Sequence, residues 1–285
     1  MTTVVAALIF AVLATPAASD EVDPGPTPTS TPTTTITTQE SSATRAVAPF
    51  ERWWYQAAPF PGPAEVEALL AQRRRDPADP RTAFWLSRYI LRTAGGTITA
   101  EQRAEVERLT RQAADGGLDI AMVSVACDEL ENSASDVEQR KAAIQTITGA
   151  LERREPQAAL SVGVYYLTGK AGFRKDPAKA VRLLRIAVDL GYVRAHRELA
   201  LAQEAAGQRG EALASMTRGA QAGDVPAMAS LGEWLMTGRV SPADRAGAEV
   251  WLRKAAQAGH PNARRLLKEL LRKPPPSPRQ SEKAA

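Results

Sequence analysis

The sequence predicts an all-α protein, an α-solenoid of antiparallel helix pairs between disordered N- and C-terminal tails. Three observations support this prediction. Alanine, the strongest helix former, supplies 53 of the 285 residues. Between residues 79 and 273, apolar residues recur at helical spacing. Over the same range a short motif returns every 32 to 38 residues, which is typical of helical-repeat proteins.

The composition excludes several other classes of protein. With 44% hydrophobic residues, 5% aromatic residues and a single cysteine, the chain is not collagen, a disulfide-stapled mini-protein or a multi-pass membrane protein. The net charge is only +4, and no region forms a strongly basic domain. Nucleic acid is therefore not an expected partner.

The first 19 residues have the features of a secretory signal peptide. An eleven-residue apolar run, residues 4–14, precedes small residues that allow cleavage after Ala17 or Ser19. No Lys or Arg precedes the run, so an uncleaved anchor and a buried helix stay open as alternatives. Cleavage would leave no membrane span. We expect an exported bacterial protein, either periplasmic or secreted.

Both ends of the chain have compositions that disfavour folding. Residues 20–49 form a linker, and thirteen of the fifteen residues 24–38 are Pro, Thr or Ser. Residues 274–285 form a second Pro-rich segment. Such segments have too little apolar surface to offset the entropy lost on ordering. We expect the first to be a spacer, with a glycosylated stalk as the alternative.

An aromatic segment follows the linker and begins the region 50–78. Five of the chain's fifteen aromatic residues lie between residues 49 and 63: Phe50, Trp53, Trp54, Tyr55 and Phe60. One interpretation is an N-terminal cap, in which these rings cover the exposed end of the first helix pair. The other is a partner-binding hot spot centred on Trp53, Trp54 and Tyr55. A basic run, Arg73 to Arg75, is expected at a helix C-terminus, with binding of an anionic polysaccharide or protein as the alternative.

The repeat is marked by alanines that follow a turn at constant spacing. We call them the phase alanines: Ala83, Ala121, Ala158, Ala195, Ala227 and Ala263. In the later units, a first helix is expected to end near Gly169, Gly207 or Gly238, and a second helix near Gly191, Gly223 or Gly259. Small residues at Gly163, Ala200 and Gly232 lie where the two helices of a pair should approach closely. The unit after Ala121 lacks the glycine turn.

These residues resemble the Sel1-like repeat, a relative of the tetratricopeptide repeat. The likeness is strongest over residues 158–191, which contain Asp176 and Lys179-Ala180, and over residues 227–259, which contain Trp251 and Lys254-Ala255-Ala256. The resemblance implies a right-handed α-solenoid over residues 79–273 that acts as a protein-interaction scaffold. Side chains three and six residues after the phase alanines are expected on its concave surface: Ser161, Val164, Glu198, Leu201, Ser230 and Glu233.

No pattern of residues indicates catalysis or a cofactor. The HExxH, GxSxG and SxxK motifs are absent from the sequence, and the two histidines, His196 and His260, have no second metal ligand nearby. Cys127 is expected to be a small core residue, and Asp128, Glu129 and Glu131 a solvated helix face.

We therefore expect a non-enzymatic scaffold or regulator in the cell envelope that binds a protein partner, without metal or cofactor. An anionic cell-envelope polysaccharide is the second candidate partner. Two alternatives stay open: an enzyme or enzyme subunit acting on envelope polysaccharide or peptidoglycan, and a secreted effector that binds host proteins. The oligomeric state is not predicted.

Overall fold

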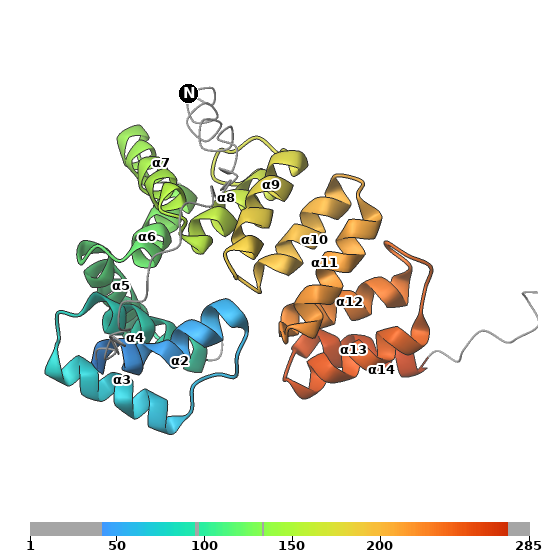
Figure 1. Cartoon of the computed structure of the whole chain (residues 1–285), viewed down its shortest axis with the longest axis horizontal. Coiled ribbons are helices and arrows are strands. Elements are labelled where there is room, and N and C mark those ends of the chain that lie inside the picture. The colour runs from blue at the N-terminus through green and yellow to red at the C-terminus, as the bar shows by residue number, and fades with distance from the viewer. Residues whose placement is uncertain (1–41, 95–96, 133, 273–285) are drawn as a thin grey trace, which may run out of the picture. The chain divides into compact units, whose positions relative to one another are not determined.

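The computed structural model describes residues 42–94, 97–132 and 134–272, which form thirteen helices and contain no strand (Figure 1). The expected signal peptide, residues 20–41 of the linker and the C-terminal tail lie outside the described residues. Residues 42–49, which were expected to be linker, instead form the first part of a helix in which Val47 is fully buried. The described chain divides into two units: unit 1 contains residues 42–50 and 61–153, and unit 2 contains residues 51–60 and 154–272. The predicted all-α fold of packed helix pairs is confirmed in each unit.

Unit 1 is built on two helix pairs. Helix α4 packs on α5, and helix α6 packs on α7. The two pairs are in contact through α5 and α6, and α3 packs on α4. Capping boxes begin α5, at Thr99, and α7, at Asp136, where side chains satisfy the first free backbone N–H groups. The helices of unit 1 are the first part of α2 (Ser42–Gln56), α3 (Pro63–Arg75), α4 (Pro80–Thr93), α5 (Ala100–Asp115), α6 (Asp119–Glu131) and α7 (Val137–Glu152).

Unit 2 continues the same arrangement of helix pairs. The first helices α8, α10, α12 and α14 alternate with the second helices α9, α11 and α13. Helices α8, α10 and α12 each pack on the second helix that follows, and α14 packs on α13. The last part of α2 also belongs to this unit. The helices are α8 (Pro156–Thr168), α9 (Pro177–Asp189), α10 (Ala195–Ala205), α11 (Arg209–Gln221), α12 (Val225–Thr237), α13 (Arg245–Gln257) and α14 (Pro261–Arg272).

The predicted phase of the repeat is confirmed by burial. All six phase alanines are fully buried, and each lies in the first turn of a first helix: Ala83, Ala121, Ala158, Ala195, Ala227 and Ala263 in α4, α6, α8, α10, α12 and α14. A methyl side chain lets the neighbouring helix approach at this position, which explains why alanine recurs there. The spacing in the sequence thus reports the packing of successive helix pairs.

Glycine ends the first helices of the two best-conforming repeats, as predicted. Gly169 and Gly238 are the C-caps of α8 and α12, with φ of 76° and 70°. A residue with a side chain is strained in this left-handed conformation, so glycine is the residue that allows the chain to turn into the second helix. After α6, which lacks this glycine, Ser135 Oγ donates instead to the carbonyl oxygen of Glu129 at 2.9 Å.

Two further glycines allow the helices of a pair to approach closely. A Cβ atom at Gly163 would lie 2.6 Å from Leu184 Cγ, and a Cβ atom at Gly232 would lie 2.7 Å from Leu252 Cγ. Real Cβ atoms do not approach other atoms so closely. The prediction of close contact at these positions is confirmed, and it gives α8–α9 and α12–α13 the same packing.

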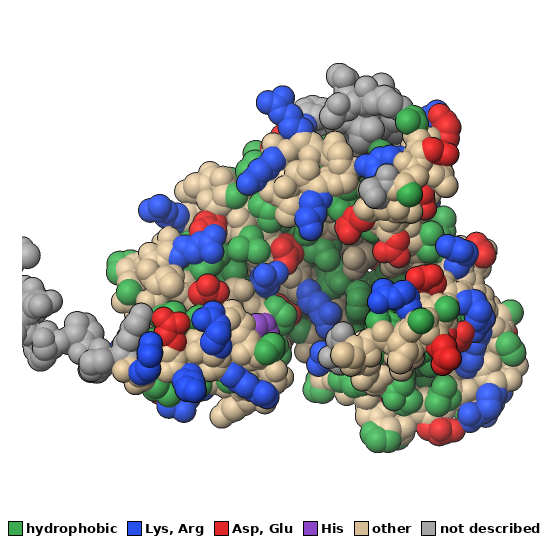
Figure 2. Space-filling view, turned by 180° about the vertical axis from the view of Figure 1, so that it is seen from behind, with side chains coloured by type: hydrophobic (Ala, Val, Ile, Leu, Met, Phe, Trp, Pro, Cys, Tyr) green, Lys and Arg blue, Asp and Glu red, His purple; other side chains and the backbone are tan. Residues whose placement is uncertain are grey.

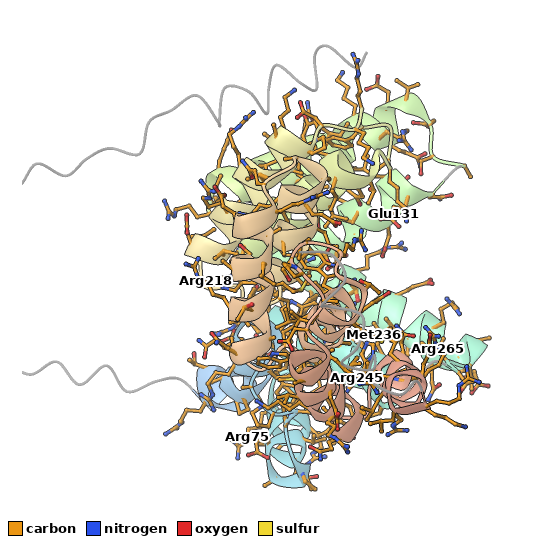
Figure 3. All side chains as sticks on the ribbon, turned by 90° about the vertical axis from the view of Figure 1, so that its right-hand side faces the viewer. Arg75, Glu131, Arg218, Met236, Arg245 and Arg265 are labelled. Carbon is orange, nitrogen blue, oxygen red and sulfur yellow. The ribbon has the colours of Figure 1, made fainter. Side chains whose placement is uncertain are left out.

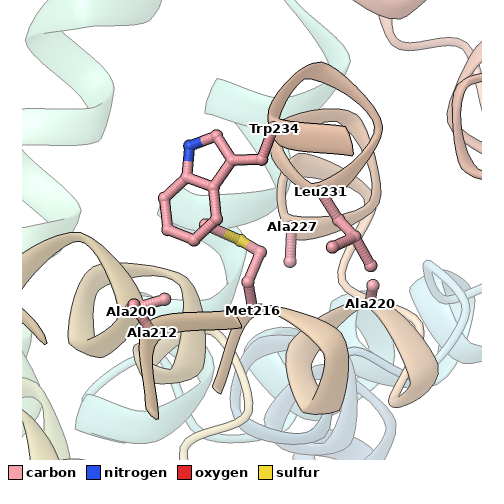
Figure 4. Packing of buried hydrophobic residues seen from close by; sticks show 7 residues of the cluster. All are labelled: Ala200, Ala212, Met216, Ala220, Ala227, Leu231 and Trp234. Atoms are coloured by element: carbon pink, nitrogen blue, oxygen red, sulfur yellow. The ribbon is translucent and has the colours of Figure 1, made fainter. Parts of the chain in front are cut away.

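The core of unit 2 lies between helices of successive repeats. Met216 of α11 packs with Leu231 and Trp234 of α12, and alanines of α10, α11 and α12 close the cluster (Figure 4). Trp234 is 1% exposed, although it is one of the largest side chains of the protein. Because this cluster includes residues of three helices, each repeat depends on its neighbour for burial of its apolar face.

His260 caps the last helix of the described chain, and its titration should make unit 2 sensitive to acid. His260 Nδ1 accepts a hydrogen bond from Ala263 N at 3.2 Å. Burial lowers the pKa of His260 below its usual 6.5. The unfolded chain therefore takes up the proton first, so the contribution to stability is complete above about pH 6.5 and is lost as the pH falls through the folded-state pKa. We expect the melting temperature to decline over this range.

The variant His260→Asn tests this expectation, because asparagine retains an acceptor for the cap but does not titrate. Its melting temperature, followed by circular dichroism between about pH 7.5 and about pH 5, should decline less steeply than that of the wild type. Burial also lowers the pKa of His196, so part of the decline should remain. An unchanged slope in His260→Asn would show that His260 is not responsible.

Candidate partner-binding surfaces

The residues expected on the concave surface lie on α8, α10 and α12, where α10 contacts both of the other helices. We call the six positions the first-helix face. All six are half-buried: Ser161, Val164, Glu198, Leu201, Ser230 and Glu233. Leu201 also packs against the buried cluster around Met216 and Trp234. The first-helix face is mainly polar, with Val164 and Leu201 as its apolar members.

Arg197, which lies outside the positions given by the repeat spacing, organises this face. Its Nε atom donates to Ser230 Oγ at 3.2 Å, and its guanidinium forms an ion pair with Glu198. Arg197 thereby joins α10 to α12 through side chains that partly exclude water. Its position two residues after a phase alanine was the only signal available in the sequence.

The aromatic segment also packs within unit 2. We call residues 51–60 the strap. The Tyr55 hydroxyl donates to Glu155 Oε1 at 3.0 Å, and the Tyr55 carbonyl oxygen accepts from Val193 N at 2.7 Å. The rings of Tyr55 and Tyr192 meet edge to face at a centroid distance of 5.2 Å. The strap is thus held at the starts of α8 and α10 by hydrogen bonds and ring contacts.

Arg194 holds the two tryptophans of the strap. Its guanidinium carbon lies 5.2 Å from the ring centroid of Trp53 and 5.2 Å from that of Trp54. Trp53 also contacts Phe60 edge to face at 5.0 Å and is 8% exposed. A guanidinium over an indole face is attracted by the ring quadrupole, so two such contacts fix the position of the strap.

This arrangement differs from the predicted N-terminal cap. The cap interpretation placed the aromatic rings on the first helix pair, but Trp53, Trp54 and Tyr55 contact Glu155, Tyr192 and Arg194 of unit 2. Phe50 is fully buried and belongs to unit 1. Residues about 100 positions apart meet here, and no local pattern in the sequence reports such a contact.

Burial also changes the ionisation of the tyrosines at the strap. It raises the pKa of Tyr55 well above the usual range, and the adjacent carboxylate of Glu155 raises it further. Burial likewise raises the pKa of Tyr192. Both hydroxyls therefore stay protonated and act as donors, Tyr55 to Glu155 and Tyr192 to Gln157 Oε1 at 3.0 Å.

The remaining candidate residues occupy ordinary structural positions. Arg73, Arg74 and Arg75 form the last turn of α3, as expected for cations at a helix C-terminus. Cys127 was expected in the core, but it is only half-buried on α6. Burial raises the pKa of the Asp128 carboxyl, and Glu129 accepts a hydrogen bond from Ser135. Among the described residues, no group of His, Cys, Asp and Glu could hold a metal ion.

A basic surface is present on the last two helices. On α13 and α14 the exposed cations outnumber the acidic residues Glu249 and Glu269, and blue side chains dominate the lobe beside the grey C-terminal trace (Figure 2). Arg265 of α14 and Arg75 of α3 both lie at the surface (Figure 3). The exposed cations are Arg253, Lys254, Arg264, Arg265, Lys268 and Arg272. None of the described helices has the length and apolar character of a membrane span.

Comparison with known proteins identifies the repeat. The model of the Sel1 repeat matches residues 156–192 and 225–260, which contain α8–α9 and α12–α13. A Sel1 repeat protein from Oxalobacter formigenes has a similar structure, with a TM-score of 0.53 and 23% identity over 81% of this chain and 90% of that protein.

A second solved structure, a protective antigen of uropathogenic Escherichia coli that displays an SLR fold, is 20% identical. Its TM-score is 0.46, and the match covers 72% of this chain and 43% of the antigen. No curated protein sequence matches the chain.

Proposed function

We propose that this chain, in which two segments match the Sel1 repeat, is an exported, non-enzymatic Sel1-like scaffold that binds a protein partner through its first-helix face. The observation that carries the proposal is the Arg197 contact between α10 and α12. Arg197 donates to Ser230 and pairs with Glu198, so polar groups of two repeats are held in position before a partner arrives. Preorganised groups lower the entropy cost of association.

The chemistry of the surface favours binding over turnover. The first-helix face combines two apolar side chains, Val164 and Leu201, with hydroxyl and carboxylate groups, a mixture typical of protein interfaces. Fold alone does not determine activity, so the non-enzymatic character rests on these side chains. Hydrolysis of purified peptidoglycan or envelope polysaccharide by the protein would contradict this part of the proposal.

Export is supported by the apolar run of residues 4–14 and the small residues after it. We therefore place the partner in the periplasm or outside the cell. The basic surface on α13 and α14 favours an anionic envelope polysaccharide as a second ligand, because exposed cations attract a polyanion over several ångströms at low salt.

The variant Ser161→Lys tests the first-helix face. Ser161 is half-buried on α8, and a lysine there adds bulk and charge to the face while its ammonium can reach solvent. Affinity capture from the envelope fraction, read by mass spectrometry, should identify a partner that the wild type retains and Ser161→Lys retains at least about tenfold less. A loss of this size corresponds to about 1.4 kcal/mol of binding free energy.

Gln257→Lys is the matched control, because it adds the same charge at an exposed position of the second helix α13. It should retain the partner as the wild type does. Circular dichroism must show that both variants are folded. Equal retention of the partner by Ser161→Lys and Gln257→Lys would place the interface elsewhere.

A further inference from the structure

The strap lies beside the starts of three successive first helices, α8, α10 and α12. Glu155, Tyr192 and Asp224 each precede a phase alanine by three residues, at the starts of α8, α10 and α12. The strap contacts Glu155 and Tyr192 directly, and the Ala57 carbonyl oxygen lies 3.6 Å from where a Cβ atom of Gly223 would stand. An extended row of helix starts is thus covered by one segment of the same chain.

We propose that this row is a binding site for an aromatic segment of a partner protein, and that the strap is its built-in occupant. The residues at these helix starts that contact the strap are called the strap seat: Glu155, Tyr192, Val193, Arg194 and Gly223. The proposal concerns a surface distinct from the first-helix face and does not depend on a partner binding there.

The strap seat is held in place by bonds that do not involve the strap. Glu155 Oε1 accepts from Gln157 N at 3.1 Å and so caps α8. The Tyr192 hydroxyl donates to Gln157 Oε1 at 3.0 Å, and Tyr192 N donates to Ala187 O at 3.0 Å. These bonds belong to the repeats themselves. The seat should therefore keep its shape when the strap leaves, which is the property of a preformed site.

The chemistry of the seat specifies its ligand. Arg194 makes no ion pair among the described residues, and its guanidinium faces the two indole rings of Trp53 and Trp54 instead. Glu155 accepts a hydrogen bond from the hydroxyl of Tyr55, which follows the two tryptophans, and Val193 N donates to the carbonyl oxygen of Tyr55. The seat therefore fits a segment with two adjacent aromatic residues followed by tyrosine.

The strap can leave without unfolding any repeat of unit 2. In the sequence it is flanked by Phe50 and Pro61, which belong to unit 1, and it contributes no residue to α8–α14. The contacts that hold it on the seat include ring contacts and the hydrogen bonds of Tyr55. Because the strap is part of the same chain, its effective concentration is high, and a partner segment must compete with it. Strap occupancy thus lowers the apparent affinity for the partner.

Binding of a labelled peptide tests the proposal. The probe is a synthetic fluorescent peptide of residues 51–62, and fluorescence anisotropy measures its affinity for the full-length protein. We expect the double variant Trp53→Ala/Trp54→Ala to bind the peptide at least about tenfold more tightly than the wild type does, since its own strap no longer fills the seat. Adding Arg194→Ala to the double variant should abolish this gain.

Two controls accompany the binding measurement. A peptide in which both tryptophans are replaced by alanine should not bind, and circular dichroism should show the variants folded. If the double variant is unfolded, Tyr55→Phe replaces it, with an expected gain of about fivefold from loss of one hydrogen bond of the strap. Equal affinity of variant and wild type, no binding to a folded variant, or binding unaffected by Arg194→Ala would each overturn the proposal.

Discussion

Replacement of Trp234 by alanine should lower the free energy of unfolding by about 3–5 kcal/mol, the usual range for removal of a large buried aromatic side chain. Trp234 is 1% exposed and packs against Met216 in the cluster that joins α10, α11 and α12 (Figure 4). Its loss leaves a cavity at the junction of two repeats, which the surrounding helices can only partly fill. Urea denaturation followed by circular dichroism measures the change.

Trp251→Ala is the matched control for this prediction. Trp251 is half-buried on α13, and the Lys254 ammonium lies 4.5 Å from its ring centroid at the surface. Its removal leaves a smaller cavity, so the free energy of unfolding should fall by less than in Trp234→Ala. Trp251 packs at the edge of the same cluster, so equal losses in Trp234→Ala and Trp251→Ala would show that the complete burial of Trp234 is not the reason for its large contribution.

Replacement of Gly232 by valine should destabilise the protein by about 1–3 kcal/mol through overpacking, with the larger value favoured by the geometry. A Cβ atom at this position would lie 2.7 Å from Leu252 Cγ and 3.2 Å from the backbone nitrogen of Leu252. A side chain can rotate away, but the backbone nitrogen can move only if α13 moves. Thermal and urea denaturation should both show the loss.

Gly210→Ala provides the opposite expectation. A Cβ atom at Gly210 meets nothing within 4 Å, and the residue lies in α11. Alanine should therefore stabilise this helix, by about 0.4–1 kcal/mol, because it reduces the entropy of the unfolded chain. If Gly232→Val were tolerated as well as Gly210→Ala, close approach of α12 and α13 would not be the reason for glycine at position 232.

The repeat was predictable because its signals are local and periodic. A helix pair needs a small residue at the contact, a glycine at the turn and apolar residues on one face, and each requirement recurs at a fixed interval. The phase alanines, the C-cap glycines Gly169 and Gly238, and the close contacts at Gly163 and Gly232 were all identified in this way. The irregular unit after Ala121 shows the limit, because side-chain hydrogen bonds of Ser135 replace the glycine turn there.

The binding surfaces were only partly predictable. Counting from the phase alanines placed Ser161, Ser230 and Glu233 on first helices correctly, but it also selected Leu201, which packs against a buried cluster. The same counting missed Arg197, whose importance arises from a contact with Ser230 on the next first helix. A position within one helix does not report which side chain of another helix it meets.

Periodicity along the chain was sufficient to establish the all-α class, the helix pairs and their turns, because these depend on residues within about 40 positions of one another. The contacts of the aromatic strap, by contrast, were visible only in the folded chain. Tyr55 and Glu155 are 100 residues apart, and the two tryptophans meet Arg194 only after the repeats have stacked. The sequence around an aromatic or arginine residue does not indicate which distant residue it will contact. The position of the strap on its seat was therefore determined by the tertiary structure alone.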